Sequence, residues 1–252
     1  MADLPSLAFA AGAGVLGGAM NALAGGGTFA TLPALMALGL PANVANATSN
    51  AALLPGAAAS SWTYRDELAP VGGVGWRLLL GITFVSGLVG SLLLALTPRD
   101  AFDVIIPWLL LFAFVVMALG PRAAVWLHAR VTIGRRTLLV GQTLLGIYGG
   151  YFGGGVGMMA TATYGLLANI APREVFAMRT FMLAAANLAA TIIFTAFGLI
   201  AWEACVPMLI GSIAGGWLGA QVGRRMSGTL VRWWTLIVTG GMTLVFFLRV
   251  YA

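Results

Sequence analysis

The sequence predicts an all-α polytopic membrane protein made of two inverted repeats of about five helical segments each. The first observation is composition: 60% of the 252 residues are hydrophobic and only 8% are charged, whereas soluble proteins carry about 25% charged residues. The second is a pair of glycine triplets, at residues 25–27 and 153–155, that interrupt long apolar runs. The third is that features of the first half return about 128 residues later.

We expect eight to ten helical segments, some of them short, since about 20 apolar residues span a bilayer. The clearest apolar segments are residues 5–24, 28–38, 42–64, 76–96, 104–119, 175–200 and 206–222. Each triplet should break the first pair of segments in its half, because glycine costs about 1 kcal/mol relative to alanine in a helix. Irregular backbone in lipid survives only where protein buries it or where it lines a cavity. Whether each broken pair spans the membrane fully or forms a re-entrant hairpin stays open.

The repeat divides the chain into transmembrane repeat 1 (residues 1–121), a cytoplasmic linker (122–136) and transmembrane repeat 2 (137–252). With the triplets superimposed, Pro41 falls near Pro172. A repeat this long indicates a duplicated domain, since solenoid and propeller repeats are about 20–50 residues long. Interrupted segments at corresponding places in two halves are typical of secondary transporters.

Arginine placement predicts the topology, because all 13 basic residues are arginines. With the arginine-rich linker in the cytoplasm, the cytoplasmic side receives residues 65, 77, 122, 130, 135, 136, 173, 224, 225 and 232, and the outside only Arg99 and Arg249. That bias follows the positive-inside rule. The N- and C-termini are then periplasmic, the halves are inverted, and the bacterial inner membrane is the expected location. The net charge of +6 is better explained by topology than by nucleic-acid binding.

The residues beside the triplets form a candidate site for a small anion. A helix that begins after a break presents unpaired N–H groups and about half a positive charge, and such an N-terminus suits an anion. The alternative for the glycines is close helix packing, which is common in membranes. The candidate substrate-binding residues are Asn21, Gly25, Gly26, Gly27, Thr28, Thr48, Ser49, Asn50, Gly153, Gly154, Gly155, Arg179 and Thr180.

Arg179 lies in an apolar run, where an arginine costs about 3 kcal/mol or more and is by default a functional candidate. We expect an anionic substrate as its partner, because the nearest acid, Glu174, lies on a different helical face. The alternative is that Arg179 snorkels to the cytoplasmic headgroups. Thr48 and Ser49 fall at the equivalent place in the first half and can donate to oxyanions, or else bond between helices.

Several chemistries find no support in the sequence. All seven carboxylates fall at or near segment ends, and a proton or sodium relay usually needs one at the membrane midplane. The single cysteine, Cys205, offers neither a disulfide nor a metal site, so we expect no metal and no cofactor. A membrane hydrolase would need a buried Ser–His pair or paired acids, and we therefore expect no enzyme activity.

The residues resemble a known family. The run from Gly14 to Pro41 holds the triplet and Gly39-Leu40-Pro41 and is followed by Ala47-Thr48-Ser49-Asn50. This order resembles the N-terminal signature of the TauE/SafE family of sulfite exporter-like membrane permeases. Residues 146–155 and Arg179-Thr180 resemble that family's second repeat, so the resemblance covers nearly the whole chain. The chain departs from the family at Arg179-Thr180-Phe181, where a Gly-Thr-Ser-like element is common.

The resemblance implies export of sulfite or a related sulfur-containing or organic anion. We expect a secondary transporter that works by alternating access, since a potential that is negative inside drives anions outward by about 2.3 kcal/mol per charge per 100 mV. An anion channel and a non-transporting membrane scaffold subunit are the alternatives. The expected partners are a small anion such as sulfite or sulfoacetate and membrane lipid, with no nucleic acid; a homodimer is left open by the sequence.

Overall fold

The computed structural model describes residues 3–128, 134–168, 172–223, 225–226 and 228–251. Within these ranges the chain forms ten α-helices, one short 3-10 helix and no β-strand. Six of the helices are long and apolar enough to cross a bilayer. The predicted all-α membrane class is therefore confirmed.

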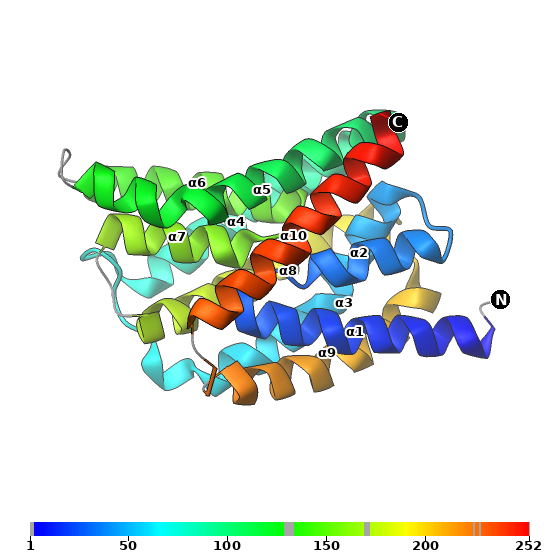
Figure 1. The fold of residues 1–252 in the computed structure, drawn as a ribbon, viewed down its shortest axis with the longest axis horizontal. Helices are drawn as coiled ribbons and strands as arrows, with labels where there is room; N and C mark the ends of the chain where they lie inside the picture. The colour runs from blue at the N-terminus through cyan, green and yellow to red at the C-terminus, as the bar shows by residue number, and fades with distance from the viewer. Residues whose placement is uncertain (1–2, 129–133, 169–171, 224, 227, 252) are drawn as a thin grey trace.

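In chain order (Figure 1) the helices are α1 (Leu4–Ala24), α2 (Thr28–Ala37), α3 (Ala42–Thr63), η1 (Arg65–Glu67), α4 (Trp76–Leu96), α5 (Arg99–His128), α6 (Arg135–Tyr151), α7 (Val156–Ala168), α8 (Pro172–Ala196), α9 (Trp202–Gly223) and α10 (Gly228–Tyr251). Most of these bounds lie within a few residues of the prediction. The helix predicted at residues 104–119 was too short, because α5 begins at Arg99. The side chain of Asp100 lies in its first turn, where an acid interacts favourably with the helix dipole.

The helix α5 also continues to His128, and α6 begins at Arg135. The expected linker at 122–136 therefore falls partly on these two helices, and residues 129–133 lie outside the described ranges. The division of the chain into two repeats and a linker stays a prediction.

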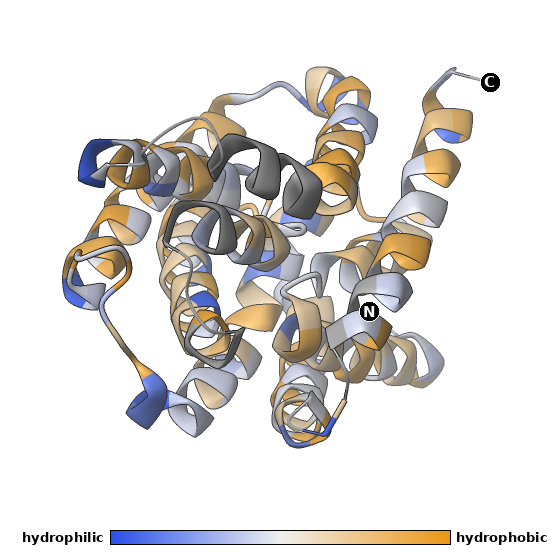
Figure 2. Cartoon of the chain, turned by 60° about the vertical axis from the view of Figure 1, so that its left-hand side comes forward, coloured by the Kyte–Doolittle hydropathy of each residue, from blue (hydrophilic) through white to orange (hydrophobic). Residues whose placement is uncertain are grey.

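The outer surface is apolar over much of its extent. Figure 2 shows hydrophobic residues along most helices and hydrophilic ones mainly near helix ends. Large side chains such as Trp233, Ile237 and Leu16 are more than half exposed. Exposed apolar surface on this scale marks a surface that contacts lipid or another protein, and lipid is the natural neighbour of helices long enough to cross a bilayer.

Both broken pairs fold back as hairpins. A methyl group placed on Gly17 of α1 would lie 2.5 Å from the Thr31 side chain of α2, so α2 runs back along the last turns of α1. In Figure 1, α1 and α2 extend toward the end of the molecule that carries both termini, whereas α6 and α7 extend toward the opposite end. The two hairpins therefore approach each other from opposite ends.

Glycines bring the long helices into backbone contact. Gly14 and Gly18 of α1 lie against the backbone carbonyls of Met208 and Ser212 on α9. In the same way, Gly90 of α4 lies against the carbonyl of Ile147 on α6. Small residues allow this close approach. The first helix of each half thus packs on the fourth helix of the other half, and α3 and α8 lie against each other between them.

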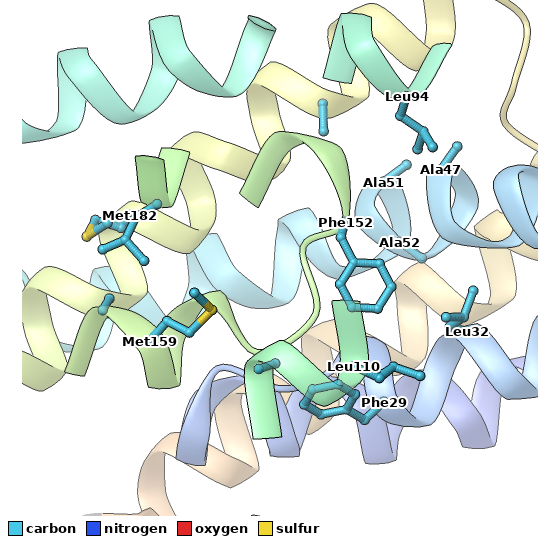
Figure 3. Packing of buried hydrophobic residues seen from close by; sticks show 14 of the residues in the cluster. Phe29, Leu32, Ala47, Ala51, Ala52, Leu94, Leu110, Phe152, Met159 and Met182 are labelled. Atoms are coloured by element: carbon cyan, nitrogen blue, oxygen red, sulfur yellow. The ribbon is translucent and has the colours of Figure 1, made fainter. Parts of the chain in front are cut away.

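The apolar core surrounds the two breaks. Phe29 follows the start of α2 and Phe152 is the C-cap of α6, where the second break begins; both are 2% exposed or less. Figure 3 shows Phe152 beside Ala51 and Ala52 of α3, and Phe29 beside Leu110 of α5. This packing fixes the place of each break within the membrane-embedded body.

Candidate functional site

The two glycine breaks lie against each other inside the protein. Gly25 and Gly153 share the left-handed backbone conformation, with φ of 74° and 75°, and Gly155 has φ of 77°. The Gly25 backbone contacts Gly157 in the first turn of α7, where an added methyl group would lie 2.6 Å from the Gly25 Cα. Left-handed backbone costs other residues about 1–2 kcal/mol, and the contact leaves no space for a side chain.

Both breaks present buried backbone amides without a protein acceptor. In the first break Gly27 donates to the Asn21 Oδ1 at 3.4 Å, whereas the amides of Gly26 and Thr28 donate to no described residue. In the second break the amides of residues 154–157 likewise find no acceptor among the described residues. These residues are buried. Because more than 90% of buried backbone amides in proteins are paired, this cluster favours a bound anion or water.

Arg179 lies beside this cluster. The Arg179 Nη2 donates to the carbonyls of Ala22 and Leu23, at 2.8 and 3.1 Å, and its Cζ lies 4.2 Å from the centre of the Phe176 ring. The guanidinium therefore caps the carbonyl end of α1, where a positive charge is favourable. The side chain is 3% exposed, and its Nε is buried without a partner.

Carboxylates do not neutralise this charge within the part of the chain that the structure describes. There, the ion pair found joins Arg65 and Asp66, 3.8 Å apart on the surface. The predicted anionic partner of Arg179 is untested, but an N–H group of the arginine is available for one.

A second side chain, this time from the first half, donates a hydrogen bond to the backbone of the other half. The Asn46 Nδ2 of α3 donates to the Tyr151 carbonyl at the end of α6, 3.0 Å away. Tyr151 lies 128 residues after Leu23, the repeat offset. Each half therefore caps the first helix of the other half, with Arg179 in one direction and Asn46 in the other.

The remaining sequence-predicted residues occupy varied places. Thr48 accepts from the Ala201 amide at 3.0 Å near the start of α9, and the hydroxyls of Ser49 and Thr31 lie 2.5 Å apart. The Thr180 hydroxyl bonds within its own helix to Ala177. Asn50 lies against Gly153. The structure thus gathers Asn21, Thr28, both triplets and Arg179 around the breaks and places Thr48 at another helix contact.

Cavities open away from the breaks. One of them, about 550 Å³, lies between the starts of α1 and α9 and is lined by Asp3, Ser6 and Glu203. Another, about 330 Å³, is lined by Asp103 and Arg249. The first is lined by a residue near the N-terminus, Asp3, and the second by residues near the C-terminus, Arg249 and Val250. Neither includes a residue of the triplets.

Sequence reasoning missed one central residue and undervalued another. Gly157 touches both Gly25 and Arg179, and its signal was the glycine two positions after the second triplet. Asn46 lies one helical turn before the predicted residue Asn50 but is not among the candidate residues. Its partner, Tyr151, is 105 positions away, and no local pattern reveals such a contact.

A family model matches most of the chain. The family model described as "Sulfite exporter TauE/SafE" matches residues 10–246. The chain belongs to the TauE/SafE family. The resemblance predicted from the glycine triplet, Gly39-Leu40-Pro41 and Ala47-Thr48-Ser49 is thereby confirmed.

Curated relatives of this TauE/SafE chain match over most of their lengths. "Probable membrane transporter protein ORF9" of Sinorhizobium sp is 31% identical over 223 residues, 87% of this chain and 82% of the relative. "Probable membrane transporter protein YfcA" of Escherichia coli (strain K12) is 26% identical and covers 91% and 85%. A "Probable membrane transporter protein" of Haemophilus influenzae is 30% identical and covers 89% and 88%. No solved structure matches this chain.

Proposed function

We propose that the chain exports sulfite or a related small sulfur-containing or organic anion across the bacterial inner membrane by alternating access. The coarser part of this statement follows from the family: the chain is a multi-pass membrane transporter of the TauE/SafE family. The substrate, the direction and the mechanism are our proposal.

One observation supports an anionic substrate: both breaks have unpaired amides, and the Arg179 side chain, whose Nε has no partner, lies against Gly157 at the second break and binds the end of α1 at the first. The N-termini of α2 and α7 add the positive ends of two helix dipoles. Asn21 adds a further donor, because its Oδ1 accepts from Gly27 and its Nδ2 is buried without a partner. Donors that converge in a buried, low-dielectric place favour a negatively charged ligand.

Alternating access is supported by the relation between the halves. The helices α1–α5 of the first half correspond in order to the helices α6–α10 of the second half. The packed pair α1 and α9 then corresponds to the packed pair α6 and α4, and the pair α3 and α9 corresponds to the pair α8 and α4. Together with hairpins that enter from opposite ends (Figure 1), this arrangement supports inverted repeats with a site between them, as in secondary transporters. Both termini lie at one end of the molecule, and we assign that end to the periplasm because the other carries most of the arginines.

The test is sulfite efflux from proteoliposomes that contain the purified protein. We expect Arg179→Gln to slow efflux at least about tenfold, since a hydrogen bond to a charged group contributes about 1.5–3 kcal/mol. Arg65→Gln is the matched control, because Arg65 is on the surface, and it should keep the native rate. Monodisperse elution of both variants shows that they fold.

Three results would change the proposal. An unchanged rate in Arg179→Gln would remove this arginine from the site. Efflux that rises linearly with sulfite concentration and never saturates would favour the anion channel over alternating access. A purified protein that moves no anion at all would favour the scaffold alternative.

A further inference from the structure

The two breaks differ in the polarity of their unused side-chain atoms. Beside the first break the buried atoms without a partner are donors, the Asn21 Nδ2 and the Arg179 Nε. Beside the second break they are acceptors, the Asn46 Oδ1 and the Asn50 Oδ1. An acceptor does not bind an oxyanion oxygen, so this second pair has no role in holding the exported anion.

The identity of these acceptor atoms is fixed by their neighbours. The Asn46 amide donates to the Tyr151 carbonyl at 3.0 Å, and the Asn50 amide donates to the Asn46 carbonyl at 2.9 Å. Because a carbonyl only accepts, the nitrogen of each amide must face it and the oxygen must be the free atom. Asn46 is 0% exposed and Asn50 is 1% exposed.

The carbonyl end of α6 lies beside these oxygens. Asn46 reaches Tyr151, the last residue of that helix, and the Asn50 Oδ1 lies against Gly153 in the break. Gly149 and Gly150 lie in the last turn of α6. Among the described residues, no backbone amide donates to their carbonyls apart from any bond within the helix itself. The C-terminal end of a helix also carries about half a negative charge. Several neutral oxygens and a negative dipole end thus meet in one buried place.

We propose that Asn46, Asn50 and the carbonyl end of α6 bind a small monovalent cation, with Na⁺ as the probe. Backbone carbonyls at broken helices and amide oxygens suit such ions. A divalent ion is disfavoured, because Mg²⁺ and Ca²⁺ sites in proteins use carboxylates, and the described residues hold no metal-binding cluster of acids, histidines or cysteine. The cavity lined by Asp3 and Glu203 gives the terminal end of the protein an acidic opening that suits a cation.

The experiment measures thermal unfolding of the purified full chain in NaCl and in choline chloride at equal ionic strength. We expect Na⁺ to raise the Tm by about 3–6 °C at ten times its Kd. In Asn50→Leu, which keeps the volume but lacks the oxygen, the Na⁺-dependent shift should disappear. Asn50→Asp should keep or enlarge it, because a carboxylate binds the ion more tightly. Asn187→Leu, at a buried asparagine of α8, is the matched control and should keep the native shift.

The outcomes separate this proposal from the proposed function. A native protein with the same Tm in both salts overturns the cation site and leaves a buried water as the occupant. A Na⁺ shift that survives in Asn50→Leu overturns the assignment to these residues. Stabilisation by choline sulfite is measured beside it, and its absence would count against the anion site without affecting the cation site.

Discussion

The contact between the two breaks predicts that Gly25 tolerates no side chain. Gly25→Ala must hold a left-handed backbone, with φ of 74°, at a cost of about 1–2 kcal/mol. The new methyl group would also overlap Gly157, and overpacking costs about 1–3 kcal/mol more. The sum is about 2–5 kcal/mol. For a chain of this size 1 kcal/mol corresponds to about 2–4 °C in Tm, so we expect a decrease of roughly 4–20 °C.

Two matched variants separate the backbone cost from the contact. Gly39 has φ of 88° with open space around it, so Gly39→Ala should show the backbone cost alone, roughly 2–8 °C. Gly157→Ala has no left-handed backbone, but its methyl group would lie 2.6 Å from the Gly25 Cα. It should therefore show the contact alone. Thermal unfolding followed by size-exclusion chromatography in detergent measures all three. Equal decreases for Gly25→Ala and Gly39→Ala, with none for Gly157→Ala, would refute the contact between the breaks.

Three further predictions concern helix contacts. The hydroxyls of Ser49 and Thr31 lie 2.5 Å apart. In a double-mutant cycle with Ser49→Ala and Thr31→Val, the coupling free energy of unfolding should be about 0.6 kcal/mol and at most about 1.7 kcal/mol. Additive effects of the two substitutions would contradict the hydrogen bond. Gly18→Leu should prevent folding because the side chain would enter the α9 backbone, whereas Gly12→Leu, which faces open space, should yield a monodisperse protein. Hydrogen bonds from Ser6 lower the pKa of Asp3 below its ordinary value. The stabilisation that the Asp3 carboxylate gives to the start of α1 should therefore be complete above about pH 4 and be lost as the pH falls through the lowered pKa. Amide exchange in the first turn of α1 measures this, and Asp3→Asn should remove the pH dependence.

Much of the fold could be predicted from local patterns. The span at α4 was predicted at its observed bounds, because Gly75 precedes an unbroken apolar run and Pro98 follows it closely. The break at Gly25 was also predicted, since three glycines end a helix, whereas the sequence left open whether the broken pair forms a hairpin. The length of α5 was not predicted, because Arg99 and Asp100 are charged and precede the apolar run, yet they lie in the first turn of the helix.

The candidate site was predicted in its residue types more than in its contacts. Arg179 stood out as a charge in an apolar run, and the structure buries it. Its contact with the end of α1 joins positions 157 apart, which no periodicity reveals. Asn46 and Thr48 look alike in sequence, two polar residues on one helix, but α3 turns one toward the α6 break and the other toward the start of α9. Packing of other helices decides this, and it is absent from the local pattern.

The hydrogen bonds by which each half caps the first helix of the other half also set an order of events during synthesis. The carbonyls of Ala22 and Leu23 obtain their donor from a residue that follows about 157 positions later. At a translation rate of about 5–20 residues per second, the nascent first hairpin waits roughly 8–30 s for Arg179 to leave the ribosome. During that interval its end depends on water, lipid headgroups or the insertion machinery for hydrogen bonds, so the first half cannot reach its final form before the second half has been made as far as Arg179.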